Sequence, residues 1–266
     1  MHDTTATTPA ITCRSIGIIG DGHYGRLLRK LIRRFALDVN VQVHDNSIDP
    51  DGHTYVRLRG LRKCDAVILA VPMDIFEQVV KNLLAVNGLR EDMVLVNVCS
   101  DQVKSGATIA ALAGKHPYIS AHSPWGPDAY RDVNEIVSLL PPIVLTKCTL
   151  PHPNDEDLFF FIQNCGFKIE TMMSAEAHDR NLAGRWMYCA HLITQILGRM
   201  KLLEEDCRAA PISYQKIVEG ARMLRDDRAL FFTLWDRVPE CHATFDAFMA
   251  AAHGLAVDRR EHISGK

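Results

Sequence analysis

The feature that constrains this chain most is a cluster of three glycines between an apolar segment and a helical one. Residues 20–25 have the sequence GDGHYG, which fits the spacing GxGxxG. The apolar run Ile16 to Ile19 precedes the cluster, the helical pattern RLLRKLIRRF follows it, and the alternating segment VNVQVHD comes next. This order predicts a strand, a tight turn, a helix and a second strand, which together form a β-α-β unit.

A glycine turn of this kind can seat the diphosphate of a dinucleotide. Gly20, Gly22 and Gly25 permit the tight turn, the close approach of a phosphate and the packing of helix on strand. Free N–H groups at the helix start favour negative charge, and His23 and Tyr24 lie in this part of the site. The hexapeptide alone is a weak signal, but the flanking strand and helix strengthen it. The basic residues of the helix are expected on its solvated face.

Asp45 ends the second strand, 25 residues after Gly20. A carboxylate there would bind the ribose 2′-hydroxyl and repel a 2′-phosphate, so the sequence favours NAD over NADP. Asp45 can also be a turn former or a cap, and the neighbouring His44 and Ser47 leave NADP open. We assign Val71 and Pro72, at the end of the segment DAVILAVP, to the same cofactor site.

Strand-like and helical patterns alternate through the first two thirds of the chain. The later strand patterns are DAVILAVP, MVLVNVCS, YISAH, IVLTK and FKIETM, and the helical patterns between them are IFEQVVKNLLAV, ATIAALAG and LFFFIQNCG. Strands that are apolar on both faces are typical of a parallel sheet covered by helices. From Ala175 the pattern is helical almost to the end. We therefore predict a polar tail over residues 1–13, an α/β dinucleotide-binding domain of the Rossmann type over 14–173, and an all-α domain over 174–266.

Composition narrows the partners. A formal net charge of −2 gives no general attraction to nucleic acid or to an anionic membrane. The sequence contains no uninterrupted run of about 18 apolar residues, the length that a membrane-spanning helix requires. The eight cysteines are scattered without CxxC pairs or a metal-ligand rhythm, so we expect reduced thiols, no disulfide and no metal site. The polar start of the sequence lacks the pattern of a secretory signal, and we expect a cytoplasmic protein.

Several separated segments together resemble the prephenate and arogenate dehydrogenase family, whose enzymes make the tyrosine ring aromatic. The segments are SIGIIGDGHYG, DAVILAVP, NVCSDQVKSG, AHSPWGP, SAEAHDRNLAG and ARMLRDDRALFFTLW, and they occur in the family's order. The resemblance implies an enzyme that transfers a hydride from a cyclohexadienyl carboxylate to a nicotinamide and releases carbon dioxide. It leaves open whether the substrate is prephenate, arogenate or an analogue of either.

The resemblance places the catalytic histidine at His122, in the segment AHSPWGP at the carboxyl end of a predicted strand. An imidazole can accept the proton of the substrate hydroxyl as the carbonyl forms. From the pattern alone, a turn or interface histidine is the more common interpretation. Ser100 matches the family serine of a D-V-x-S-V-K motif, although Asp101 and Gln102 are inserted before Val103. Ser100 is therefore the second catalytic candidate, with a polar strand end as the alternative.

The resemblance also assigns substrate-binding residues to the all-α domain. Arg222 matches a family arginine that binds a substrate carboxylate, since a guanidinium forks onto a carboxylate, but on a helix it can equally be a surface charge. A second family histidine corresponds to Ala190 here, and His191 follows it. Because one helical residue is about 100° of rotation, His191 can replace that histidine only if the helix shifts register or carries a bulge. Gln195 is another candidate for this role.

The segments MYCAHLITQIL and ALFFTLW are more apolar than a solvent-facing helix requires. The resemblance implies that such helices form a two-fold homodimer, and an intrachain core is the alternative. Two other functions stay open. One is a hydroxyacid or imine oxidoreductase of the same architecture with no role for His122. The other is a catalytically silent protein that binds a dinucleotide.

Overall fold

The computed structural model describes residues 13–123, 142–150, 162–225 and 228–264. The chain forms two compact units, residues 1–175 and 176–266. Several sequence features lie outside the described residues, namely residues 1–12 of the expected tail, the residues PWGP that follow Ser123, the start of the helical pattern LFFFIQNCG and the two aspartates of the segment ARMLRDDRALFFTLW.

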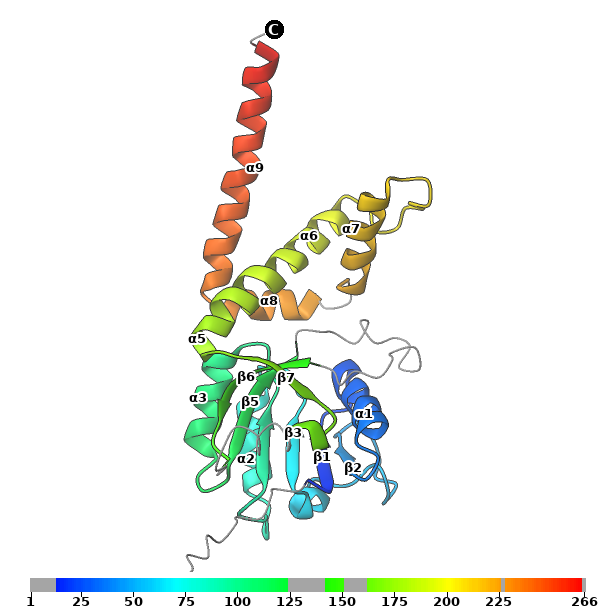
Figure 1. The fold of residues 1–266 in the computed structure, drawn as a ribbon, viewed down its shortest axis with the longest axis vertical. Helices are drawn as coiled ribbons and strands as arrows, with labels where there is room; N and C mark the ends of the chain where they lie inside the picture. The colour runs from blue at the N-terminus through cyan, green and yellow to red at the C-terminus, as the bar shows by residue number, and fades with distance from the viewer. Residues whose placement is uncertain (1–12, 124–141, 151–161, 226–227, 265–266) are drawn as a thin grey trace, which may run out of the picture. The chain divides into compact units, whose positions relative to one another are not determined.

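A seven-stranded sheet in the order β2-β1-β3-β4-β5-β6-β7 forms the centre of the first unit (Figure 1). The strands are β1 (Ser15–Ile19), β2 (Asn40–His44), β3 (Ala66–Leu69), β4 (Val94–Asn97), β5 (Tyr118–His122), β6 (Pro142–Cys148) and β7 (Lys168–Met172). β1 to β5 are parallel, β6 is antiparallel to β5, and β7 is parallel to β6. The prediction of an α/β unit with a mainly parallel sheet is confirmed, and the sheet has seven strands.

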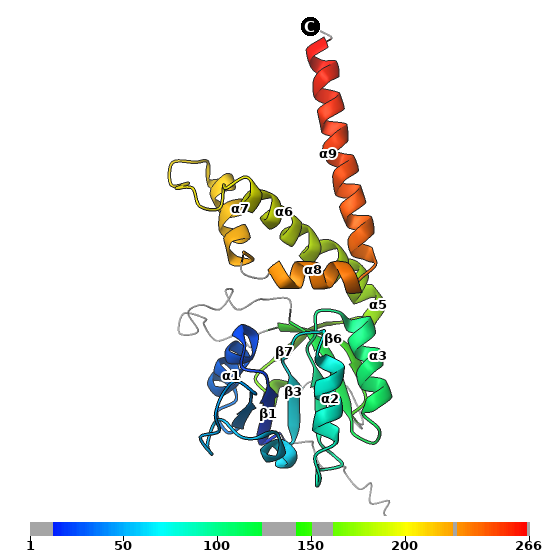
Figure 2. The same ribbon diagram turned by 180° about the vertical axis from the view of Figure 1, so that it is seen from behind.

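The connections of the first unit are α1 (His23–Phe35), the 3-10 helix η1 (Leu58–Lys63), α2 (Phe76–Leu84) and α3 (Gln102–Leu112). The chain moves from β1 to β2 in one direction and from β3 to β5 in the other. Because such crossovers are right-handed, the reversal places α1 on the face opposite α2 and α3. Figure 2 shows α2 and α3 side by side on one face of the sheet.

The core explains why α1 is a helix in this place. Its buried residues include Leu28, Leu31 and Ile32, which lie on one side of the helix, while basic residues occupy the other. Leu28 and Ile32 pack against Ile16 and Ile18 of β1, and each of these four side chains is at most 2% exposed. Burying a side chain of this size contributes roughly 1.5–3 kcal/mol.

The start of α3 differs from the prediction. The segment ATIAALAG was expected to form a short helix, but the helix begins at Gln102, five residues earlier. Asp101 is the N-cap residue, and Asp101 and Gln102 are both fully buried. Polar residues of this kind, followed by Ser105, look like a solvated loop in the sequence. In the structure Gln102 and Ser105 turn inward, because they bond to residues of the neighbouring strands.

The described residues of the second unit form helices joined by loops, and no strand occurs among them. It comprises α5 (Ala175–His178), the π-helical segment η3 (Asp179–Met187), α6 (Tyr188–Arg199), α7 (Ile212–Met223), α8 (Arg228–Arg237) and α9 (Glu240–Ser264). The Tyr188 ring is buried and stacks on Phe231 with ring centroids 5.1 Å apart. None of the described helices combines the length and the apolar character needed to cross a bilayer.

Candidate functional site

The three glycines of the turn have different surroundings. Gly20 has a φ of +97°, and a Cβ built on it would lie 2.3 Å from the Ala70 carbonyl oxygen. A Cβ on Gly25 would lie 2.0 Å from the carbonyl oxygen of Gly20, so α1 can approach β1 only without a side chain there. At Gly22 a Cβ would meet nothing within 4 Å. The chain's own packing therefore requires Gly20 and Gly25, whereas Gly22 leaves open space beside the backbone.

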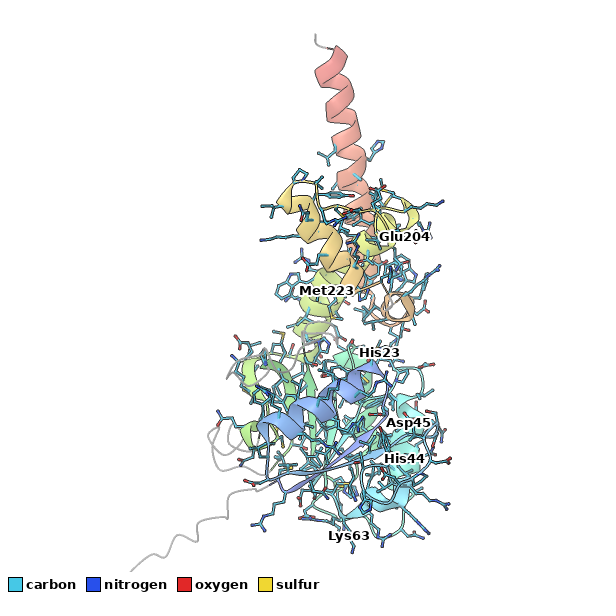
Figure 3. All side chains as sticks on the ribbon, turned by 90° about the vertical axis from the view of Figure 1, so that its right-hand side faces the viewer. His23, His44, Asp45, Lys63, Glu204 and Met223 are labelled. Atoms are coloured by element: carbon cyan, nitrogen blue, oxygen red, sulfur yellow. The ribbon has the colours of Figure 1, made fainter. Side chains whose placement is uncertain are left out.

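The start of α1 faces that open space with donors. Gly22 is the N-cap of α1 and provides no side-chain cap, and the first turn contains no acidic residue. The first N–H groups of a helix lack intrahelical partners and carry a partial positive charge, which favours an anion. His23 is exposed at this point, and Figure 3 shows it at the start of α1. An open backbone at the start of a helix fits a diphosphate.

The end of β3, next to the glycine turn, also suits a dinucleotide site. β3 lies next to β1, and the order of the sheet reverses between these two strands. In open α/β sheets, ligands bind in the crevice at such a switch point. Val71 and Pro72 follow β3, and the Val71 Cγ1 atom lies 3.2 Å from a Cβ built on Gly20. Both residues predicted for the cofactor site thus follow a strand at the switch point of the sheet.

Asp45 follows β2 and is bound to the glycine turn (Figure 3). Its Oδ2 accepts the N–H of Asp21 at 2.8 Å, and its Oδ1 accepts the N–H and hydroxyl of Ser47 at 2.8 and 2.6 Å. These hydrogen bonds, that from Asp21 foremost, lower the pKa of Asp45. An ionised carboxylate thus lies beside the second residue of the turn. The turn-forming interpretation of Asp45 is correct, because these oxygens organise the loop.

Sequence analysis missed a buried charge inside the turn. Asp21 is only 4% exposed, and its Oδ2 accepts the Tyr55 hydroxyl at 2.8 Å and an Arg29 N–H at 3.3 Å. Its Oδ1 has no hydrogen-bond partner among the described residues. Arg29 was expected on the solvated face of the helix, but its side chain is 17% exposed and paired with Asp21. An acid at the second motif position was the only sequence sign of this cluster.

His122 ends β5 at the same carboxyl edge of the sheet and is 5% exposed. The hydroxyl of Tyr24, in the first turn of α1, is hydrogen-bonded to the hydroxyl of Ser123, and burial raises the pKa of the Tyr24 phenol. Tyr24, His122 and Ser123 also line one small apolar cavity of about 50 Å³. That volume is far too small for a nucleotide or a substrate. The cavity nevertheless shows that the glycine-turn helix and His122 are neighbours.

Ser100 lies in the loop that follows β4, and β4 is adjacent to β5, the strand that His122 ends. A network of buried amides and hydroxyls surrounds the loop in which it lies. Asn97 donates to the Ser105 hydroxyl at 2.8 Å and to the Ser120 hydroxyl at 3.2 Å, and its Oδ1 accepts the N–H of Cys99 at 3.0 Å. Ser100 thus follows β4 and His122 ends β5, and a buried hydrogen bond between Asn97 and Ser120 links the ends of these two strands.

In the second unit His191 is 1% exposed, and its Nδ1 has no hydrogen-bond partner among the described residues. Burial lowers the pKa of His191 to about 4, so the imidazole is neutral at pH 7. The π-helical segment Asp179–Met187 precedes it. In a π-helix each residue bonds to the fifth one along, so the segment accommodates one extra residue. His191 needs a shift of this kind to occupy the position of the family histidine that corresponds to Ala190 in this sequence. Gln195, one turn later, is half-buried.

Arg222 lies on α7 and is exposed, yet its guanidinium is already engaged. Nε donates to the Leu203 carbonyl at 2.7 Å, and Nη2 donates to the Glu205 carbonyl at 2.6 Å. These bonds hold the loop that follows α6. A substrate carboxylate would have to compete with two carbonyls for the same donors, so the structure provides no support for the predicted fork.

All eight cysteines are free. Among the residues that the structure describes, no cluster of three or more histidine, cysteine, aspartate or glutamate side chains has a metal-binding arrangement.

The order of the sheet and the glycine turn at its switch point define a Rossmann-type dinucleotide-binding fold. Over more than nine tenths of its length, the chain shares its fold with solved prephenate and arogenate dehydrogenases. It is similar to prephenate dehydrogenase from A. aeolicus in complex with hydroxyphenyl propionate and NAD+, with a TM-score of 0.67, 17% identity, and 94% of this chain and 93% of that chain covered. Synechocystis arogenate dehydrogenase has a TM-score of 0.63 and 14% identity, with 93% and 92% covered.

The same architecture occurs with other chemistry. A pyrroline-5-carboxylate reductase from Coxiella burnetii has a TM-score of 0.53 and 17% identity, with 93% of both chains covered. No protein-family model matches this sequence, and no curated protein sequence matches it. At these identities the likeness shows the fold, and the function has to be argued from the site.

Proposed function

We propose that this protein is an NAD-dependent dehydrogenase that oxidises and decarboxylates prephenate, or arogenate, in the synthesis of tyrosine. The observation that carries the proposal is the contact between the helix of the glycine turn and the end of β5, where His122 lies. Tyr24 of the turn's helix is hydrogen-bonded to Ser123, and Ser123 follows His122 directly. A diphosphate bound at the start of α1 would therefore lie near the imidazole that the chemistry needs.

The residues of the first unit have separate tasks in this proposal. Gly22 and the free N–H groups of α1 bind the diphosphate, and the ionised Asp45 favours a ribose that carries a 2′-hydroxyl. Bound NAD supplies the ring that accepts a hydride. His122 accepts the hydroxyl proton as the substrate carbonyl forms, and its burial limits competition from water. Ser100, after the adjacent strand, donates a hydrogen bond to the hydroxyl or to the imidazole.

In the second unit, His191 is our first candidate for contact with the substrate, and Gln195 is the second. The π-helical segment before His191 supports this choice, because it supplies the register shift that the choice requires. A neutral imidazole can exchange hydrogen bonds with the substrate but adds no positive charge. Arg222 is the weaker candidate, because its donors already bind carbonyls of its own unit.

We further propose that the protein acts in the cytoplasm as a homodimer formed by its second unit. Nine of the thirteen exposed large apolar side chains among the described residues belong to that unit. They are Trp186, Ile193, Met200, Ile212, Ile217, Met223, Phe232, Met249 and Leu255. Figure 1 shows the C-terminal half of α9 extending beyond the other helices of the unit. An apolar surface of this kind is typical of an interface between identical subunits. Light scattering on the purified protein would measure the mass directly.

The deciding experiment follows NADH or NADPH absorbance when the purified protein is mixed with prephenate or arogenate and with NAD or NADP. We expect turnover with NAD and prephenate, and turnover with arogenate alone would change the substrate. The control variant is His122→Asn, which should bind NAD with unchanged affinity and lose turnover. If His122→Asn remains fully active, a hydroxyacid or imine oxidoreductase without a catalytic role for His122 becomes the better description. NAD binding without turnover of any substrate would indicate a catalytically silent protein.

A further inference from the structure

We propose that Gln102 is a positioning residue that fixes Ser100 and His122 relative to each other. The inference rests on the catalytic roles proposed for these two residues. Gln102 is the first residue of α3 and is completely buried. It belongs to the pair of residues, Asp101 and Gln102, by which this sequence departs from the family's serine motif.

The Gln102 amide joins three parts of the first unit. Its Nε2 donates to the Cys99 carbonyl oxygen at 2.6 Å, and makes a longer contact of 3.4 Å with the Ala121 carbonyl oxygen. Its Oε1 accepts the hydroxyl of Thr146 at 2.5 Å. One side chain thus connects the loop after β4 with β5 and β6. A side-chain amide suits this position because it offers two N–H donors and one acceptor.

The two carbonyls that Gln102 contacts have a particular place in the chain. The Cys99 carbonyl is half of the peptide group that leads into Ser100, and the Ala121 carbonyl is half of the peptide group that leads into His122. Rotation of either peptide group would change the direction of the side chain that follows. By binding both carbonyls with one NH2 group, Gln102 couples the orientations of the two proposed catalytic residues.

An irregularity in the sheet gives an independent reason for the contact. Ser120 pairs with Lys147 and Ala121 pairs with Leu145, so Thr146 is an extra residue in β6 at this point. A β-bulge of this kind leaves groups unpaired and redirects neighbouring side chains, and bulges are frequent next to active sites. The Thr146 hydroxyl lies 3.0 Å from the Ser120 carbonyl oxygen as well as against Gln102. Gln102 therefore contacts two groups of a bulge that lies immediately before His122, the Thr146 hydroxyl and the Ala121 carbonyl.

The test compares Gln102→Met, which keeps the length of the side chain and removes its amide, with Leu83→Ala as a matched control. Leu83 is fully buried on α2 of the same unit, so its replacement costs stability without touching the amide network. The first readout is the pair of ring nitrogen shifts of His122 in labelled protein, identified by the signal that His122→Asn removes. We expect Gln102→Met to change these shifts and Leu83→Ala to leave them as in the wild type.

The second readout is turnover. We expect Gln102→Met to lower kcat roughly ten-fold to a hundred-fold, as small misplacements of catalytic groups do, while KM and the Kd for NAD change by less than about two-fold. Thr146→Val is the second variant, and it should shift the His122 signals in the same direction, because it removes the hydroxyl that orients the Gln102 amide. If Gln102→Met does not fold, Thr146→Val decides the question.

The outcomes separate this proposal from the proposed function. Unchanged His122 shifts in Gln102→Met, or in Thr146→Val where only that variant folds, would overturn the positioning role whether or not the protein is active. Changed shifts in a protein that oxidises no substrate would support the positioning of His122 and reject the reaction. A kcat that falls equally in Leu83→Ala would mean that general destabilisation explains the loss, and would also overturn the proposal.

Discussion

Replacing Gly22 with alanine should weaken nucleotide binding and leave the fold almost unchanged. Gly22 has φ −63° and ψ −171°, which any residue adopts, and a Cβ built on it meets no atom within 4 Å. The added methyl group would occupy only the space in which we place the diphosphate. Gly25→Ala is the matched control, because its Cβ would lie 2.0 Å from the Gly20 carbonyl oxygen, whereas real Cβ contacts are essentially never under 3.0 Å.

The two substitutions should differ clearly in magnitude. At the N-cap, alanine is worse than glycine by up to about 1 kcal/mol, but it also reduces the entropy of the unfolded chain by a similar amount, so Gly22→Ala should change the free energy of unfolding by less than about 1 kcal/mol. Gly25→Ala must move α1 away from β1 by about 1 Å and should cost about 3 kcal/mol. Loss of one charge-assisted hydrogen bond to phosphate, about 2 kcal/mol, would raise the Kd for NAD roughly 30-fold in Gly22→Ala.

Titration calorimetry with NAD measures the affinity, and urea unfolding measures the stability of each variant. The reasoning would be refuted if Gly22→Ala bound NAD as tightly as the wild type. It would be refuted equally if Gly22→Ala unfolded as easily as Gly25→Ala, because the space beside Gly22 would then not be open.

Three further predictions concern single side chains. Burial lowers the pKa of His191 from 6.5 to about 4, so the unfolded chain takes up the proton at a higher pH than the folded chain does. The free energy of unfolding should therefore fall as the pH drops from about 6.5 to 4, by up to about 1.4 kcal/mol per pH unit. Urea unfolding at several pH values should show a flatter dependence in His191→Gln, and an unchanged slope would contradict the assignment. Asp45→Asn keeps an acceptor for the Asp21 N–H and removes the charge, so the ratio of the Kd for NADP to the Kd for NAD should fall roughly ten-fold in calorimetry, whereas a constant ratio would exclude Asp45 as the selective group. Tyr24→Phe leaves the Ser123 hydroxyl without this partner and should lower the free energy of unfolding by about 1–2 kcal/mol, and stability equal to the wild type in urea unfolding would show that the bond contributes nothing.

The fold was predictable because its signals are local. Buried strands such as Ala66–Leu69 are short apolar runs, and the glycine spacing requires a strand before it and a helix after it. The predicted start of α3 was wrong because the polar residues at the beginning of this helix are buried against partners far away in the sequence. Gln102 bonds to Ala121 and Thr146, and no window of local sequence contains all three.

The candidate site was predictable only in part, for the same reason. Gly22 and His122 lie at one edge of the sheet because each stands at the carboxyl end of a parallel strand, and the alternating pattern of strands and helices predicts such a sheet. The pairing of Asp21 with Arg29 could not be foreseen, because a helix with many basic residues gives no sign of which one turns inward. The engagement of Arg222 with the loop at Leu203 depends on how two helices pack, and periodicity does not report this packing.

A wide turn gives a helix spare backbone. The π-helical segment Asp179–Met187 can hold one residue more than an α-helix of the same length. The contacts at its two ends, the hydrogen bond between His178 and Asp179 and the stacking of Tyr188 on Phe231, keep their positions. Two proteins that differ by one residue at this place can therefore have the same arrangement in space although their letters no longer line up. A sequence comparison without a gap would then underestimate the identity of the two proteins across this helix. The gap in the alignment belongs inside the π-helical segment Asp179–Met187.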